Sequence, residues 1–463
     1  MMFTSNLAFA VVCLAAGMGD RAVEPDGSTI PRSAPPALAA QIASAVDARA
    51  TKGYVESLAG FGTRHTLSDA SSATRGIGAA RNWIKSKFDE FAATSEGRMQ
   101  VQLETFEQPP ATRVPQGATL VNVVAVLPGS MPEAAQRRYY VVGHYDSRNG
   151  ETMDVTGDAP GANDDASGTA VVIELARVLA DKKLDATVVF LATAGEEQGL
   201  LGAAYHASQA RGEQILGVLS NDIVGDPTGP ASSDGVPRRA ADRIRVFSEG
   251  VPRNPSAEKL AGIRNLAGES DSPSRQLARY VDFVAAWHEL PVRPMLVFRP
   301  DRFLRGGDHS AFNEAGFPAV RFTTVYENYD RQHQNITMKD GEPYGDVPKF
   351  VDEVYLGNVA RLNAAALVHL ANAPSPPPKA RLLTAQLAND TTIRWQSSPE
   401  PDVAGYEVVW RLTTEPTWTH VRDVGSAREA TIDLSKDDWF FGVRAYDKDG
   451  YRSPVAFPVA AKE

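Results

Sequence analysis

Histidine and acidic residues gather in five short segments of this chain. The segments are VVGHYDS at 141–147, GANDDASG at 161–168, AGEEQG at 194–199, Asn221-Asp222, and GGDHS at 306–310. Each lies where the sheet pattern predicts the end of a strand or a loop. Because ligands gather beyond the carboxyl ends of strands in open α/β sheets, we expect the five segments to lie at one edge of a sheet.

The residue types in these segments suit a divalent metal ion. In His144-x-Asp146, the imidazole can bind a cation while the carboxylate orients the other ring nitrogen. Asp164 lies in a turn-rich loop that opens a helix, so it could bridge two cations while Asn163 and Asp165 support it. Two histidines with several carboxylates form a ligand set that suits zinc.

The adjacent carboxylates Glu196 and Glu197 can divide metal binding and acid–base chemistry between them. Neighbouring loop residues can point in different directions, so one carboxylate can bind metal while the other faces the substrate. A metal lowers the pKa of bound water from about 15.7 to about 7. A free carboxylate beside that water acts as a general base and later passes the proton to the leaving amine.

The elements around these segments follow a βαβ rhythm. Strands are expected at 120–127, 139–142, 187–192, 215–224, 295–298 and 319–323, and helices at 34–59, 72–93, 168–180, 276–287 and 351–371. This pattern predicts an α/β fold with a mixed, largely parallel central sheet flanked by helices. Residues 226–275 are polar and are expected to form excursions on the binding side or a surface insertion. We expect residues 226–300 to contribute to the specificity pocket.

A proline-rich stretch, Ala373–Lys379, predicts a stiff linker after the α/β region at 34–372. Beyond it, at 380–463, short β-rich runs recur about every ten residues, which is typical of a small all-β sandwich. This region resembles a fibronectin type III domain on three motifs: Trp395, GYEVVW at 405–410 and VRAY at 443–446. The resemblance implies a module for attachment to a surface or polymer, for spacing or for substrate presentation.

Composition excludes two classes of function. The chain has 463 residues with 47 Lys and Arg against 57 Asp and Glu, a formal net charge of −10, which argues against nucleic acid as a partner. The only cysteine, Cys13, lies in the N-terminal apolar stretch, so the folded part has no thiol for catalysis or metal binding.

The N-terminus predicts export. Leu7–Ala16 is an apolar run followed by polar sequence, typical of a signal peptide within residues 1–22. The run is too short to be a stable membrane span, and no later run reaches 18 apolar residues. We therefore expect a periplasmic or secreted protein, unless the apolar N-terminus stays uncleaved.

From residue 58 to the linker, the chain resembles the M28 family of di-zinc metallopeptidases, which includes bacterial secreted aminopeptidases. The resemblance rests on five motifs in the same order: His144-x-Asp146, NDDxSG at 163–168, Glu196-Glu197, Asp222 and Asp308-His309. It implies two Zn²⁺ per chain. By this resemblance His144 and Asp222 hold one ion, Glu197 and His309 hold the other, and Asp164 bridges the two.

The resemblance also assigns roles around the metals. It implies that Glu196 is the general base, that Asp146 orients a ligand, and that the peptide bond between Asp164 and Asp165 is cis. Family members stabilise the oxyanion through a Tyr or another donor near the active site. The candidates here are Tyr326, Tyr329 and His333.

The sequence therefore predicts an exported zinc-dependent exopeptidase acting on peptides or protein N-termini. Aminopeptidase action is favoured because a free N-terminal amine can approach a carboxylate-rich site. A carboxypeptidase or dipeptidase of the same family would use the same metal set. A single-zinc glutaminyl cyclase and a binding protein with a vestigial peptidase domain are also compatible with the sequence.

Overall fold

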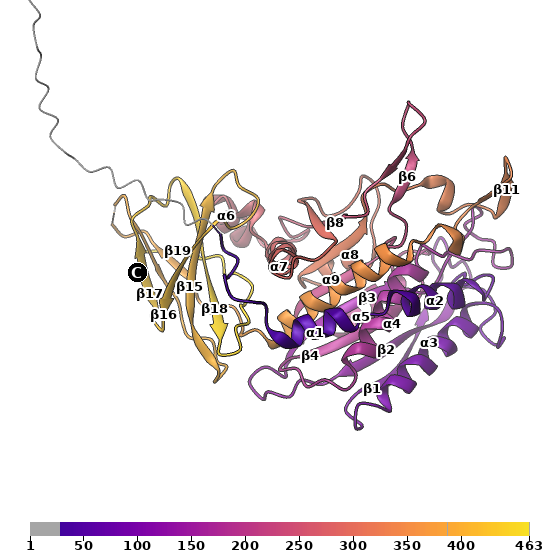
Figure 1. Ribbon diagram of the computed structural model, residues 1–463, viewed down its shortest axis with the longest axis horizontal. Coiled ribbons are helices and arrows are strands. Elements are labelled where there is room, and N and C mark those ends of the chain that lie inside the picture. Colours follow the sequence, from indigo (N-terminus) through magenta and orange to yellow (C-terminus); the bar gives the residue numbers. More distant parts are fainter. Residues whose placement is uncertain (1–27, 387, 463) are drawn as a thin grey trace, which may run out of the picture.

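The computed structural model describes residues 28–386 and 388–462 (Figure 1). The predicted export signal, Leu7–Ala16, lies outside these residues. Among the helices that the structure describes, none combines the length and the apolar character needed to cross a membrane.

An eight-stranded mixed sheet lies at the centre of the larger part of the molecule. Its strands in spatial order are β1 (Gln100–Gln108), β2 (Ala118–Leu127), β4 (Thr187–Thr193), β3 (Arg137–His144), β5 (Gln214–Asn221), β10 (Ala319–Thr324), β8 (Arg243–Ser248) and β9 (Arg293–Val297). Strands β4, β3, β5 and β10 run parallel, whereas β2 and β8 pair antiparallel with this group. The predicted fold class is confirmed, and the carboxyl ends of four strands share one edge.

Helices cover both faces of this sheet because its central strands are apolar on both sides. In β3, Tyr139 and Val141 join one buried cluster, while Tyr140 and Val142 join a second cluster on the opposite face. The first cluster includes residues of α1 (Ala37–Ala45), α2 (Ala48–Ala59), α3 (Ile77–Ala92), α4 (Ala166–Leu179), α7 (Pro273–Trp287) and α9 (Glu353–Asn372). The second includes residues of α5 (Leu201–Gln209) and α8 (Asp308–Glu314).

The helix predicted over 34–59 is in fact two helices, α1 and α2. Val46 is extended, with ψ 123°, and ends α1. The Asp47 carboxylate then accepts hydrogen bonds from the backbone N–H groups of Arg49 and Ala50, which starts α2 in a new direction.

The region 226–275 forms regular structure, including one strand of the central sheet, and not only surface loops. It includes the sheet strand β8, whose side chains alternate between exposed and buried along its first half. The region also contributes α6 (Ala257–Asn265) and the short hairpin of β6 (Thr228–Ala231) and β7 (Pro237–Arg239). A second small hairpin pairs β11 (Thr337–Lys339) with β12 (Glu342–Tyr344).

Two small sheets form the C-terminal β-sandwich. One contains β17 (Glu429–Ile432), β14 (Thr391–Arg394), β13 (Arg381–Leu383) and β19 (Val459–Ala461), and the other β16 (His420–Gly425), β15 (Val403–Leu412) and β18 (Trp439–Asp447). Their facing side chains form a separate apolar core that includes Trp395, Tyr406 and Phe441. The sandwich lies beside α6 and α7 at one end of the molecule (Figure 1). Its fibronectin-like character stays a prediction.

Candidate active site

The central strands bring the predicted motifs to one sheet edge. His144 is the last residue of β3, Glu196 follows the end of β4 by three residues, and Asp222 comes directly after β5. Asp164 precedes α4, whose first turn is capped by the side chain of Asp165. Because β4, β3 and β5 are neighbouring parallel strands, side chains far apart in sequence meet here.

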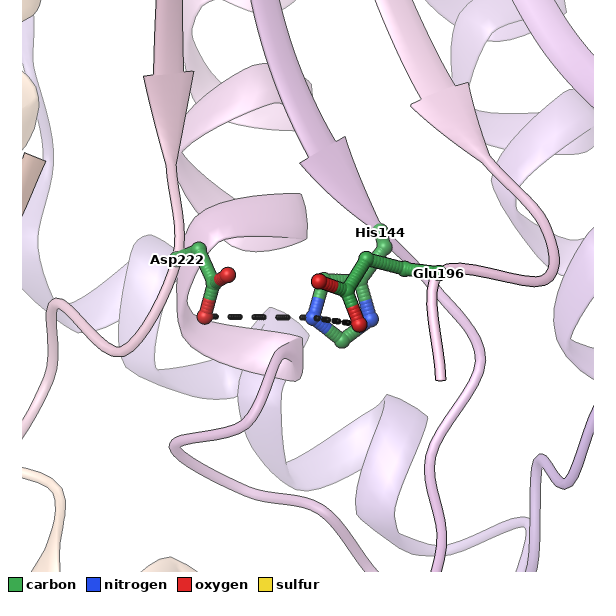
Figure 2. A group of neighbouring side chains, drawn as sticks. All are labelled: His144, Glu196 and Asp222. Atoms are coloured by element: carbon green, nitrogen blue, oxygen red, sulfur yellow. Dashed lines mark ion pairs between the residues drawn. The ribbon is translucent and has the colours of Figure 1, made fainter. Parts of the chain in front are cut away.

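Two clusters of potential ligands form at this edge. The first contains His144, Glu196 and Asp222 (Figure 2). The Nε2 atom of His144 lies 3.9 Å from Asp222 Oδ1 and 4.0 Å from Glu196 Oε2. All three side chains converge on one point from the ends of three strands.

The second cluster contains Asp164, Glu197 and His333. The Nε2 atom of His333 lies 2.9 Å from Asp164 Oδ2 and 2.9 Å from Glu197 Oε1. His333 has φ 50°, the left-handed conformation, which costs an L-residue about 1 kcal/mol or more. Its backbone therefore adopts an unfavourable conformation that directs the ring into this cluster.

Asp164 connects the two clusters. Its Oδ1 lies 3.2 Å from His144 Nε2, while its Oδ2 faces His333. One carboxylate thus presents an oxygen to each group, which is the arrangement that a bridging ligand requires. The peptide bond between Asp164 and Asp165 is cis, as the resemblance implies.

Asp146 holds the first cluster in place. The Nδ1 atom of His144 lies 3.2 Å from the Asp146 carbonyl oxygen and 3.5 Å from its Oδ1, so it donates there. The Asp146 carboxylate also accepts hydrogen bonds from the backbone N–H groups of Glu196 and Glu197 and from the hydroxyl of Thr66. One buried carboxylate therefore orients the imidazole and both glutamates.

The donor atoms fit a divalent cation. Burial opposes protonation of His144, but Glu196 and the other carboxylates around the ring raise its pKa well above the usual value, so a bound cation would displace the proton of Nε2. His144 Nε2 and Asp222 Oδ1 are both buried, and neither has a hydrogen-bond partner among the described residues. Imidazole nitrogens and carboxylate oxygens together are the ligands of zinc sites.

The carboxylates differ in their protonation. Burial raises the pKa of Glu196 well above its usual range, and the charges of Asp222 and Glu197 add to this although His144 opposes it. Burial would also raise the pKa of Asp222, but Arg321 and His144 lower it below the usual value. Glu196 is thus suited to hold a proton, whereas Asp222 stays ionised as a ligand should.

Comparison with known proteins identifies the family. The model of Peptidase family M28 matches residues 122–344. A probable zinc metalloprotease from Leptosphaeria maculans is 44% identical over 434 residues, which cover 93% of this chain and 99% of that protein. The chain belongs to peptidase family M28. The predicted family resemblance and the prediction of a peptidase are confirmed.

Further relatives of this M28 peptidase agree with that assignment. A probable zinc metalloprotease from Pyrenophora tritici-repentis is 44% identical over 408 residues, 87% of this chain and 83% of that protein. An aminopeptidase from Aneurinibacillus sp. strain AM-1 has a similar structure, with a TM-score of 0.50 and 14% identity over 72% of this chain and 96% of that chain. At this identity, the likeness establishes a shared fold only.

The expected pairing of His309 with Glu197 is wrong. His309 is the second residue of α8, and its Nε2 lies 2.8 Å from the carbonyl oxygen of Pro300, to which it donates. Burial lowers the pKa of His309, so the ring is neutral in this position. In this M28 peptidase His333, proposed from sequence as an oxyanion or substrate residue, lies where His309 was expected.

The two tyrosines proposed with His333 separate in the structure. Tyr329 lines the active-site cavity and is 60% exposed. Tyr326 instead packs against Gly229 of β6 and lies near the guanidinium of Arg238. An oxyanion role is therefore sterically open to Tyr329, and Tyr326 is placed to support the hairpin.

Several residues that sequence reasoning missed contact the site. Arg321 Nη2 lies 2.9 Å from Asp222 Oδ2, and Asp346 accepts hydrogen bonds from the backbone N–H groups of Asn163 and Asp164. Burial raises the pKa of Asp346 to about 7. Neither residue lies in a recognisable motif. Each belongs to a segment that is distant in sequence and that only the fold brings near the site.

A cavity of about 530 Å³ lies beside the two clusters. Glu196, Glu197 and His333 line it, together with Arg113, Arg148 and Arg305. The prediction that residues 226–300 line the pocket is wrong for this cavity, because that region lies farther along the sheet at β8 and β9 and in the contact with the C-terminal sandwich.

Proposed function

We propose that this chain is an exported, two-zinc exopeptidase that removes N-terminal residues from peptides. The observation that carries the proposal is Asp164, whose two carboxylate oxygens face two separate clusters of ligands. The names of the relatives, probable zinc metalloproteases, support zinc as the metal. The aminopeptidase of similar fold supports the subtype.

The described residues divide into two ligand sets that share Asp164. One zinc would be held by His144 and Asp222, and the other by Glu197 and His333. When bound, zinc would polarise the scissile carbonyl and make water a stronger nucleophile at neutral pH. Two separate sets favour two ions over the single zinc of a glutaminyl cyclase.

Glu196 is the proposed general base. Its carboxylate faces the first cluster and the cavity, and its raised pKa suits a group that takes up a proton. It would accept the proton of the attacking water and deliver it to the departing amine as the peptide bond breaks. Asp146 would fix its position through the backbone N–H group of Glu196.

The acidic residues that line the cavity support the aminopeptidase subtype. A free N-terminal ammonium is attracted to carboxylates, and Glu196 and Glu197 are the acidic residues that line this cavity. A blocked N-terminus would lose that attraction. A carboxypeptidase would use the same metal set but would not depend on a free amine in this way, whereas a dipeptidase would require a free carboxylate as well.

The deciding experiment compares aminoacyl-anilides with free and N-acetylated termini, using chelated protein and zinc-restored protein. We expect zinc-dependent cleavage of the free-amine series only. No cleavage of either series by protein that binds two zinc ions would favour carboxypeptidase or dipeptidase substrates. Protein with neither cleavage nor bound zinc would be a binding protein with a vestigial peptidase domain.

Two further parts of the proposal concern the ends of the chain. Export rests on the apolar run Leu7–Ala16. For the C-terminal sandwich we propose a structural role, because Arg411 of β15 forms a buried ion pair with Asp271 just before α7. A module serving only as a flexible attachment would not need such a contact.

A further inference from the structure

The active-site cavity has an excess of positive charge. Three arginines, Arg113, Arg148 and Arg305, line it, whereas its only acidic lining residues among those the structure describes are Glu196 and Glu197. Both glutamates belong to the catalytic clusters described above. The rest of the cavity wall therefore offers guanidinium groups and no carboxylate to a substrate.

Arg113 is the most available of the three. It lies in the exposed connection between β1 and β2, and its Nη1 donates to the backbone carbonyl of Glu197 at 2.7 Å. Among the described residues it forms no ion pair. The contact with Glu197 directs the side chain into the cavity, while its charge is left without a counterion.

Arg305 carries charge that the surrounding carboxylates do not neutralise. Behind this side of the cavity, four guanidinium groups share three carboxylates. Glu327 is contacted by Arg245, Arg302 and Arg305. Asp301 is contacted by Arg302 and Arg321, and Arg321 also contacts Asp222. The Arg305 side chain is 30% exposed, the highest fraction of the four. The excess positive charge is therefore most accessible to a ligand at Arg305.

Arg148 has a different position. Its Nε lies 2.9 Å from Glu197 Oε2, and its Nη2 contacts Nδ1 of His333. It is thus tied to the second ligand cluster. A substitution of Arg148 would disturb that cluster, so this residue is unsuitable for testing substrate recognition.

We propose that this cavity selects peptides that carry a carboxylate just beyond the scissile bond, and that Arg113 and Arg305 bind it. The inference rests on the proposed peptidase function and adds the class of substrate. The carboxylate can be the C-terminus of a short peptide or the side chain of an Asp or Glu. Guanidinium recognises both through the same paired N–H donors.

This selection is compatible with a free N-terminus on the same substrate. The amine would lie toward Glu196 at the zinc clusters, and the carboxylate toward the arginines at the cavity wall. A cavity of about 530 Å³ is in the range that holds a small ligand, such as the end of a peptide. Opposite charges at the two ends would fix the direction in which the peptide enters.

The test uses four peptides with free N-termini in two matched pairs. Leu-Ala is compared with Leu-Ala amide, which probes the terminal carboxylate, and Leu-Glu amide with Leu-Gln amide, which probes the side chain. Release of leucine gives kcat/KM for zinc-loaded wild type, for Arg113→Gln, for Arg305→Gln and for the double variant. Arg394→Gln, on the exposed surface of β14 and paired with Glu429, is the matched control.

We expect at least one acidic peptide to be preferred over its neutral partner by about 10- to 100-fold, the value of a charged hydrogen-bonded contact. The preference should fall below about threefold in the double variant and persist in Arg394→Gln. Which pair shows it identifies the source of the carboxylate. A wild-type preference near one, or a preference unchanged in the double variant, overturns the inference while leaving the peptidase proposal intact.

Absence of leucine release from all four peptides would count against the proposed aminopeptidase function instead. Calorimetric binding of the same peptides to zinc-loaded Glu196→Gln protein then decides the carboxylate inference separately. Tighter binding of an acidic peptide, lost in the triple variant with Arg113→Gln and Arg305→Gln, supports it. Equal binding of both members of each pair overturns it.

Discussion

Among single residues, Asp164 connects the two clusters of potential ligands and His333 completes the second. Asp164 faces both clusters, and His333 supplies the imidazole of the second one. Sequence reasoning assigned that second imidazole to His309, which follows two glycines and an aspartate and so looks like a loop motif. In the structure, a carbonyl oxygen already occupies the Nε2–H of His309.

The two histidines provide a matched test of zinc content. We expect His333→Gln to bind about one zinc per chain instead of two and to lose most activity, because the second cluster keeps only carboxylates. His309→Gln should still bind two, since a Gln amide can donate to Pro300 in place of Nε2. Metal analysis of both purified proteins measures this. Loss of zinc in His309→Gln with full occupancy in His333→Gln would instead make His309 the ligand.

Glu196 gives a prediction that separates catalysis from binding. Glu196→Gln removes the base but preserves size and polarity, so we expect kcat to fall by about 10²- to 10⁴-fold while zinc stays bound. Steady-state assays beside metal analysis measure both quantities. A variant that keeps near wild-type turnover would show that another group takes the proton.

Among the secondary-structure elements, α7 and α9 are joined by a contact between the half-buried His288 and the buried His369. Nε2 of His288, at the end of α7, lies 2.8 Å from Nε2 of His369 in α9. One ring must donate and the other accept, so both cannot be protonated. Burial lowers the pKa of His288 to about 4, and burial together with His288 and Arg452 lowers the pKa of His369 well below its usual value.

This pair predicts a loss of stability in acid. Both folded-state pKa values lie below the unfolded value of about 6.5, so the unfolded chain binds more protons as the pH falls. The contribution of the two neutral rings to the free energy of unfolding is complete above pH 6.5 and is lost as the pH falls toward 4. Between pH 6.5 and 5 we expect the free energy of unfolding to fall by about 1–2 kcal/mol per ring. The fall is smaller for the partly exposed His288 because of solvent screening.

Thermal unfolding at pH 7 and pH 5 checks the prediction against the double variant His288→Gln/His369→Gln. The wild type should lose more stability than the variant over this interval, since glutamine does not titrate. The comparison cancels carboxylates elsewhere, such as Asp447, whose pKa burial raises to about 7 and whose effect has the opposite sign. Equal losses in the two proteins would contradict the assignment.

In the molecule as a whole, buried charges attach the C-terminal sandwich to the peptidase part. Arg411 of β15 contacts both carboxylate oxygens of Asp271, at 3.0 and 2.8 Å, and Arg279 of α7 contacts the same carboxylate at 3.1 Å. Arg137 of β3 approaches Glu400 at 3.5 Å, with both side chains almost fully buried. The proline-rich stretch takes part in this interface, because Ser375 donates to Glu400.

Breaking the central ion pair should therefore destabilise the whole chain. We expect Arg411→Ala to cost about 3–5 kcal/mol, because Asp271 would keep a buried charge with one partner fewer. Arg394→Ala, which removes a half-exposed pair with Glu429, should cost no more than about 1 kcal/mol. Urea unfolding of the full chain measures both. Equal costs would mean that the interface contributes little.

Local sequence signals were sufficient to predict which residues next to strand ends gather at the sheet edge. His144, Asp164, Glu197 and Asp222 were predicted because each is encoded locally, beside an apolar run or a helix start. Parallel strands in one sheet then necessarily bring those ends together. The family resemblance and the fold class depended on the same local signals.

The remaining site residues could be found only in the folded chain. His333, Arg321 and Asp346 lie in stretches without a motif, and they reach the site because β10 and the chain after it pack along the sheet edge. The same holds for Arg113, which comes from the connection between β1 and β2. Contacts between distant segments depend on the packing of the whole chain, so neither spacing nor periodicity predicts them.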